Sequence, residues 1–69
     1  MKIIVNGEEK KLESSEKRLL LSESLELMGY RRNSIVVELN DLIVNTKKWD
    51  IVTLKEGDKL EIVSIVGGG

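Results

Sequence analysis

The sequence contains neither cysteine nor histidine among its 69 residues. A disulfide framework and a zinc site built from Cys and His ligands are therefore excluded. Ser–His and Cys–His catalytic pairs are excluded as well, because one partner of each is missing. The acidic stretch near the N-terminus has no recognisable metal-ligand spacing; its carboxylates are Glu8, Glu9, Glu13 and Glu16. We expect no catalytic centre within this chain, no bound metal and no bound cofactor.

The sequence also lacks an excess of charge of either sign. Eleven basic and twelve acidic residues give a net charge of -1, which does not provide the positive field that attracts nucleic acid. We interpret the basic pairs Arg31-Arg32 and Lys47-Lys48 as solvated loop positions. No apolar run approaches the ~20 residues of a membrane span, and the apolar start is too short for a signal peptide. These features predict a cytoplasmic protein that binds neither nucleic acid nor membrane.

The length is sufficient for one small domain, which we place at residues 1–65, followed by a flexible tail at residues 66–69. The domain is predicted to begin with a β-hairpin formed by Lys2–Val5 and Glu8–Leu12. Asn6-Gly7 lies between these strands, and this pair favours the two positive φ angles of a type I′ turn. Because this second strand is polar, we expect only one or two of its side chains to reach the core.

A short amphipathic helix is predicted next. Leu21, Leu25 and Met28 recur at the spacing of one helix face. Gly29 stands where a glycine in the left-handed conformation would end the helix. Ser14-Ser15 is a candidate cap for its start, although it lacks the Glu three residues later that completes a capping box.

The second half of the chain is rich in β-forming residues. The runs that predict strands are residues 34–39, 42–44, 51–54 and 59–66. Asn40-Asp41 forms a turn between the first two runs. Residues 45–50 are polar around Trp49, so a turn or one helical turn is expected there, with Thr46 as a possible cap. We expect Trp49 to be a packing anchor, not a platform for a ligand.

This order of elements predicts an α+β fold of the β-grasp (ubiquitin-like) class. In such a roll, one main helix crosses one face of a mixed sheet of four or five strands. The helical connection permits the first and last strands to pair in parallel at the centre of the sheet. The predicted sheet residues facing the helix are Ile3, Val5, Leu60 and Ile62.

The chain ends in Val66-Gly67-Gly68-Gly69. Because glycine has no Cβ, such a tail can enter a channel too narrow for other residues. Four extended residues reach at most ~14 Å. The free carboxylate at the end of this tail is expected to be the reactive group of the molecule.

A possible partner surface lies beside the tail. Period-2 alternation in the last strand turns Val63 and Ile65 away from the helix. Val66 continues this strand, and Ile4 and Val36 could extend the surface onto its neighbours. An exposed apolar patch is a plausible docking site. The alternative interpretation is that these residues are ordinary exposed aliphatics or are covered by loops.

The sequence resembles the ThiS family, the ubiquitin-like sulfur carriers of thiamin thiazole biosynthesis. The similarity extends over essentially the whole chain and is strongest from Val36 to Gly69. Leu20 stands where similar proteins have a Thr or Ser helix cap. The fragments that carry the resemblance are Val37-Glu38-Leu39-Asn40, Ile43-Val44, Trp49, Leu54-Lys55-Glu56-Gly57-Asp58, Ile62-Val63 and Val66-Gly67-Gly68-Gly69.

The resemblance implies a protein co-substrate instead of an enzyme. A ThiF-type adenylyltransferase would use ATP to activate the carboxylate of Gly69, and a sulfur-donor system would convert it to a thiocarboxylate. Thiazole synthase (ThiG) would then consume the sulfur, while Gly67 and Gly68 thread the tail into each partner. The free carrier is expected to be a monomer.

Two other functions remain open from the sequence. The small subunit of molybdopterin synthase shares the fold, the terminal diglycine and the thiocarboxylate, but such chains are commonly longer and rich in Phe, which is absent here. The other is a non-covalent β-grasp interaction module, with incidental glycines. Near-zero net charge disfavours an RNA-binding version of this module.

Overall fold

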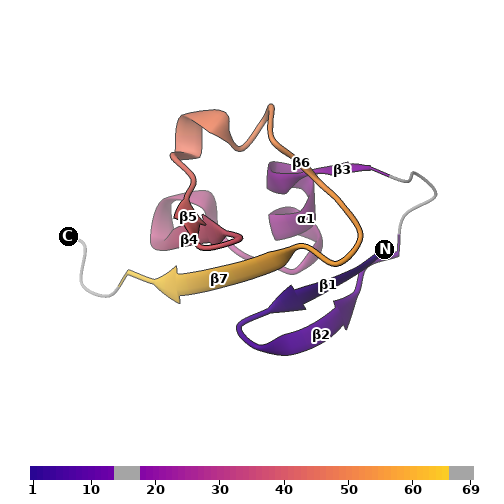
Figure 1. Ribbon diagram of the computed structural model, residues 1–69. Helices are drawn as coiled ribbons and strands as arrows, with labels where there is room; N and C mark the ends of the chain where they lie inside the picture. The colour runs from indigo at the N-terminus through magenta and orange to yellow at the C-terminus, as the bar shows by residue number, and fades with distance from the viewer. Residues whose placement is uncertain (14–17, 66–69) are drawn as a thin grey trace.

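The computed structural model describes residues 1–13 and 18–65, and a five-stranded mixed sheet is its main layer (Figure 1). The strands lie in the order β2-β1-β7-β4-β5, so the last strand of the chain occupies the centre. Strand β7 pairs in parallel with β1 and antiparallel with β4. The bounds are Lys2–Val5 for β1, Glu8–Lys11 for β2, Ile35–Leu39 for β4, Leu42–Ile43 for β5 and Lys59–Ser64 for β7.

Two hairpins form the outer parts of the sheet, and each is closed by a two-residue turn. Asn6 and Gly7 have φ angles of 50° and 82°, as a type I′ turn requires. Asn40 and Asp41 likewise have φ angles of 49° and 72°. The predicted Asn-Gly hairpin is confirmed, and all four side chains of β2 are exposed.

The helix α1 (Leu21–Leu27) begins directly after Leu20, and not near Ser14-Ser15. Leu20 has no side-chain acceptor, but its backbone N–H donates to Glu23 Oε1 at 3.0 Å. At the other end, Gly29 has a φ of 85°. Tyr30 N–H donates to the Leu25 carbonyl oxygen at 3.0 Å, which is the outer bond of a Schellman motif. The predicted glycine stop is therefore confirmed.

The core lies between α1 and the facing side of the sheet. Ile3, Val5, Leu60 and Ile62 are buried, as predicted, together with Leu21 and Leu25 of the helix. Met28 is half-buried and packs against this cluster. Trp49 is only 1% exposed, which confirms its role as a packing anchor. The other buried apolar residues are Leu12, Leu19, Ile35, Val37 and Leu54.

A second, two-stranded sheet was not predicted. Strand β3 (Leu19–Leu20) pairs antiparallel with β6 (Thr53–Leu54) and joins the start of α1 to the loop after Trp49. Two residues are too few to show an alternating pattern, so only the tertiary pairing reveals β3.

Short 3₁₀ helices complete the fold: η1 (Arg32–Ser34) and η2 (Thr46–Lys48). The proposal of Thr46 as a cap is wrong. Asn45 is the cap, and its Oδ1 accepts a hydrogen bond from the Lys47 N–H at 2.9 Å. The last strand ends at Ser64, earlier than predicted, and Val66 lies outside the described residues. Across residues 1–13 and 18–65, no helix is both long and apolar enough to cross a membrane.

Candidate functional site

Strand β7 positions the part of the chain that leads into the glycine tail. After Ser64, the Ile65 N–H donates to the Ser34 carbonyl oxygen at 2.7 Å, which attaches the chain to η1. The residues predicted to carry and thread the sulfur, Gly67, Gly68 and Gly69, lie outside the described residues, as does Val66. The domain therefore fixes the point from which the tail departs, at the η1 end of the central strand.

The side chain of Asn6 holds the middle of β7. Its Oδ1 accepts from the Ile62 N–H at 2.7 Å, and its Nδ2 donates to the Ile62 carbonyl oxygen at 3.2 Å. The Asn6 N–H also donates to the Leu60 carbonyl oxygen at 2.9 Å. Asn6 thus continues the β1–β7 pairing beyond the end of β1, with its amide in place of a peptide group.

We expect Asn6→Ala to lower the free energy of unfolding by about 1–3 kcal/mol, because both backbone groups of Ile62 lose their partner. Asn6→Gly removes the same amide but adopts the positive φ without strain. Its loss of stability therefore reports the hydrogen bonds alone, without the backbone strain that alanine adds. Urea denaturation of the three proteins measures both contributions. An Asn6→Gly protein as stable as the original would show that the amide contributes nothing.

The outer face of the sheet, opposite α1, carries apolar side chains near this exit. Val36 and Val63 are directly opposite each other on β4 and β7, and they are 39% and 59% exposed. Ile65 follows at 49% exposed. Three of the predicted surface residues therefore lie at the tail end of the central strands with their side chains accessible.

The registers place Ile4 away from this group. It lies opposite Lys59, at the other end of β7, and is half-buried. Glu38 and Glu61 form the cross-strand pair between the two regions. An additional residue, Ile43, lies opposite Glu38 on β5 and is 73% exposed. The Asn40-Asp41 turn could have revealed it, because a two-residue turn fixes the register and hence the face of Ile43.

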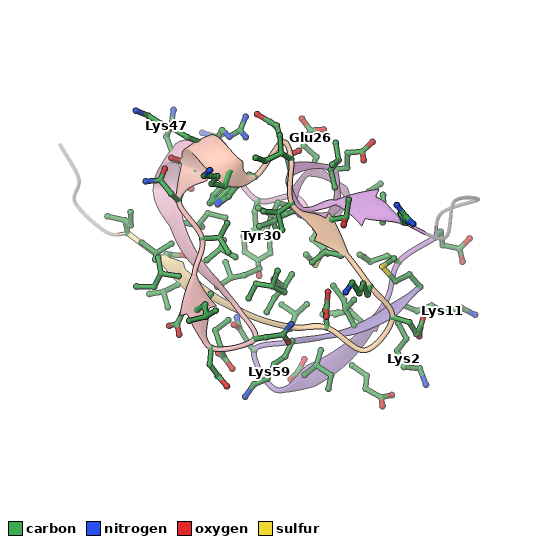
Figure 2. The ribbon with its side chains drawn as sticks, turned by 45° about the horizontal axis from the view of Figure 1, so that its top comes forward. Lys2, Lys11, Glu26, Tyr30, Lys47 and Lys59 are labelled. Carbon is green, nitrogen blue, oxygen red and sulfur yellow. The ribbon has the colours of Figure 1, made fainter. Side chains whose placement is uncertain are left out.

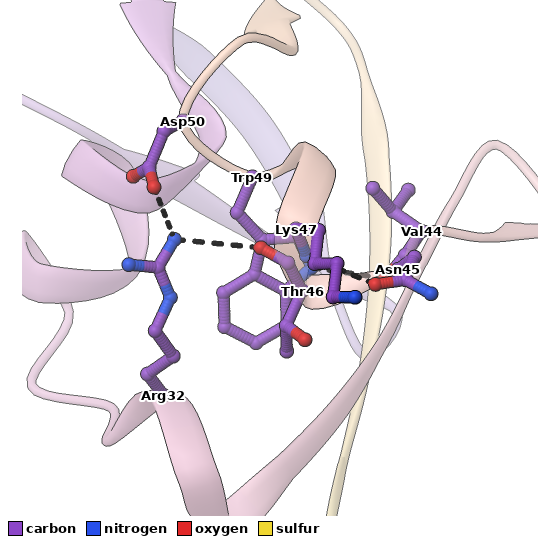
Figure 3. Close-up of polar contacts among 7 residues, drawn as sticks. All are labelled: Arg32, Val44, Asn45, Thr46, Lys47, Trp49 and Asp50. Atoms are coloured by element: carbon purple, nitrogen blue, oxygen red, sulfur yellow. Dashed lines mark hydrogen bonds and ion pairs between the residues drawn. The ribbon is translucent and has the colours of Figure 1, made fainter.

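A half-open cavity of about 250 Å³ lies on the helix side of the molecule. It is lined by Ser22, Leu25, Glu26, Tyr30, Arg32, Trp49 and Asp50. Arg32 crosses its rim, with its guanidinium 5.5 Å from the centre of the Trp49 ring and 2.9 Å from the Asp50 carboxylate (Figure 3). Arg32 is exposed, as predicted, but these contacts hold its guanidinium in place, which the sequence did not predict.

The Arg32 guanidinium lowers the pKa of Asp50 below its usual value, and the Ser22 hydroxyl acts in the same direction. A carboxylate with a lowered pKa stabilises the fold above its unfolded pKa, and this contribution is lost as the pH falls through the folded value. The Arg32–Asp50 pair therefore stabilises the fold at neutral pH. Within residues 1–13 and 18–65, no three acidic side chains come together in a way that could hold a metal ion.

The profile of the ThiS family matches residues 3–69, which includes the three glycines. The chain belongs to the ThiS family. The resemblance read from the sequence is confirmed, and with it the assignment to the small sulfur carriers of thiamin biosynthesis.

Solved structures of this family have the same fold. The crystal structure of the thiamine biosynthesis protein ThiS from Geobacter metallireducens superposes with a TM-score of 0.82 at 30% identity, and the match covers 100% of both chains. The β-grasp prediction is therefore confirmed, including the five-stranded mixed sheet and its single α-helix among the described residues.

Among relatives in sequence, a thiazole synthase from Paramagnetospirillum magneticum is 36% identical over all 69 residues. This match spans 20% of that protein, so the chain is similar to one fifth of its length. The ycf40 protein of Trieres chinensis is 39% identical over 49 residues, which are 71% of this chain and 67% of the relative.

Proposed function

We propose that this ThiS-family protein carries sulfur on the terminal carboxylate of Gly69 and delivers it to a thiazole synthase in the cytoplasm. The observation that carries the proposal is the family match, which continues through the glycines to residue 69. The geometry supports it, because the central strand leads the chain out of the domain beside an exposed apolar face.

The chemistry explains why such a carrier needs a partner that uses ATP. A terminal carboxyl group has a pKa of about 3.3–3.7, so at neutral pH it is an anion that resists nucleophiles. A carboxylate oxygen of Gly69 would attack the α-phosphate of ATP and release pyrophosphate, giving an acyl adenylate on a ThiF-type enzyme. A donor that supplies sulfur at the sulfide level would then attack the acyl carbon, displace AMP and leave the thiocarboxylate. The carrier itself acts as a co-substrate and binds no cofactor.

The relatives support the proposed acceptor. Two proteins named thiazole synthase each contain a segment, one fifth of their length, that aligns with all 69 residues of this chain. The presence of a segment similar to this chain within two thiazole synthases favours the same pairing here. The family match likewise favours thiamin biosynthesis over the molybdopterin and non-covalent alternatives.

The proposal is tested by incubating the protein with a ThiF-type enzyme, ATP and a sulfur donor, followed by intact mass spectrometry. Before the reaction, we expect the mass of a chain whose last residue is Gly69. After it, we expect one oxygen of the C-terminal fragment to be replaced by sulfur. The loaded protein is then offered separately to thiazole synthase and to the large subunit of molybdopterin synthase. Absence of both the adenylate and the thiocarboxylate would contradict the carrier function. Consumption by the molybdopterin synthase subunit alone would assign the protein to that pathway instead.

The apolar outer face is proposed as the contact that holds the domain while the tail is threaded. Val63→Gln should reduce kcat/KM for adenylation about 5-fold or more, as expected for an interface residue worth over 1 kcal/mol. Leu27→Gln is a matched control, because Leu27 is 58% exposed on α1 and Val63 is 59% exposed. Steady-state kinetics compare the two, and equal effects would argue against contact at this face.

A further inference from the structure

Four basic residues from separate parts of the chain gather beside the exit of β7. Arg31 and Arg32 lie at η1, and Lys47 and Lys48 end η2. Arg32 Nη2 donates to the Thr46 carbonyl oxygen at 3.5 Å, which joins the two turns. The Ser34 carbonyl oxygen of η1 also accepts a hydrogen bond from the Ile65 N–H, so these four residues, here called the basic cluster, lie near the end of β7.

The turns that present the basic cluster are held in place. Arg32 stacks over Trp49 and pairs with Asp50, while Asn45 caps η2 through the Lys47 N–H (Figure 3). The Trp49 Nε1–H donates to the Val44 carbonyl oxygen at 2.9 Å, which fixes the buried ring under these turns. The two lysines are therefore exposed side chains on an ordered platform, and little entropy of the backbone is lost when a partner binds them.

The basic cluster carries a net positive charge although the whole molecule is slightly acidic. Its four cations and the paired Asp50 sum to +3, whereas the complete chain has a net charge of -1 and the remaining residues therefore sum to -4. In the part of the chain that the structure describes, the ion pairs engage Arg32 but none of the other three cluster residues. Positive charge is thus concentrated beside Ile65, where the described chain leaves β7, and an acidic surface would be attracted there.

We propose that the basic cluster docks on an acidic surface of the enzyme that adenylates the tail. This inference rests on the proposed function, since that enzyme is the first protein to take up the tail. Opposite charges of this kind steer encounter and raise association rates by about 10–10³-fold at low salt. Nucleic acid is a weaker candidate, because the rest of the molecule is acidic and the Trp49 ring beneath the cluster is buried, so it cannot stack on a base.

The test is charge reversal on the two exposed lysines. Lys47→Glu/Lys48→Glu is compared with Lys10→Glu/Lys11→Glu, which makes the same change of charge on the edge strand β2. Figure 2 shows Lys47 and Lys11 on opposite sides of the molecule. The rate of adenylation is measured from the release of pyrophosphate, at low and at high NaCl. Thermal unfolding first establishes that both variants are folded.

We expect the η2 variant to lose at least about 10-fold in kcat/KM at low salt and most of its salt dependence, and the β2 variant to lose less than about 2-fold. Equal losses in the two variants, or a salt-independent rate for the original protein, would overturn the inference while leaving the carrier function intact. Failure of the original protein to be adenylated at all would instead overturn the proposed function, and the inference with it. Lysine-dependent binding of an RNA oligonucleotide with unchanged adenylation would reassign the cluster to nucleic acid.

Discussion

Deletion of Gly69 is expected to abolish sulfur loading while leaving the domain as stable as before. The deletion moves the terminal carboxylate back by one residue, ~3.5 Å along an extended chain. Misplacement of a reacting group by even 1 Å can cost about 100-fold in rate, so loading should fall by at least that factor. The effect should appear in kcat more than in KM, because the proposed docking contacts lie on the domain.

Two measurements check this expectation. Intact mass spectrometry follows formation of the thiocarboxylate, and urea denaturation shows whether the domain is unchanged. Gly69→Ala is the companion variant, since it keeps the length but adds a Cβ in the proposed channel. Normal loading of the shortened chain would show that Gly69 is not the carrying position.

Replacement of Trp49 by alanine is expected to have the largest effect on stability. The ring is 1% exposed, and its removal from a packed core should cost about 3–5 kcal/mol. Small domains have a total stability of roughly 5–15 kcal/mol, so the variant should be near the limit of folding. The loss would also release Arg32, which stacks on the ring at 5.5 Å.

Trp49→Phe separates the two contributions of this side chain. It retains an aromatic ring but leaves the Val44 carbonyl oxygen without its 2.9 Å hydrogen bond from Nε1, which should cost about 1–3 kcal/mol. Thermal unfolding followed by circular dichroism measures both variants without relying on tryptophan fluorescence. A loss below about 1 kcal/mol for Trp49→Ala would contradict the anchoring role.

Much of the fold follows from local signals in the sequence. Asn6-Gly7 and Gly29 are required by backbone conformations with positive φ, and period-2 alternation separates Leu60 and Ile62 from Val63. Such local signals do not predict which residues far apart in the sequence pair with each other. Strand β3 exists because Leu19 meets Leu54, 35 positions later in the chain.

The same limit applies to the candidate site. The alternation of β7 predicted the accessible side of Val63, but the offset between β1 and β7 determines that Ile4 lies beside Lys59 instead. The sequence predicted only a solvated position for Arg32, because its partners Trp49 and Asp50 are brought to it by the fold. Charge clusters assembled from two loops are likewise invisible to composition.

The central position of β7 has a consequence for biosynthesis. A nascent chain that has not yet produced residues 59–64 has two hairpins with no strand between them, so the sheet cannot close. Contacts between residues 4–5 and 59–60 are among the most distant that a chain of this length can make, and such topologies fold late. The domain therefore cannot acquire its native structure until residues 59–64 have been synthesised and have left the ribosome.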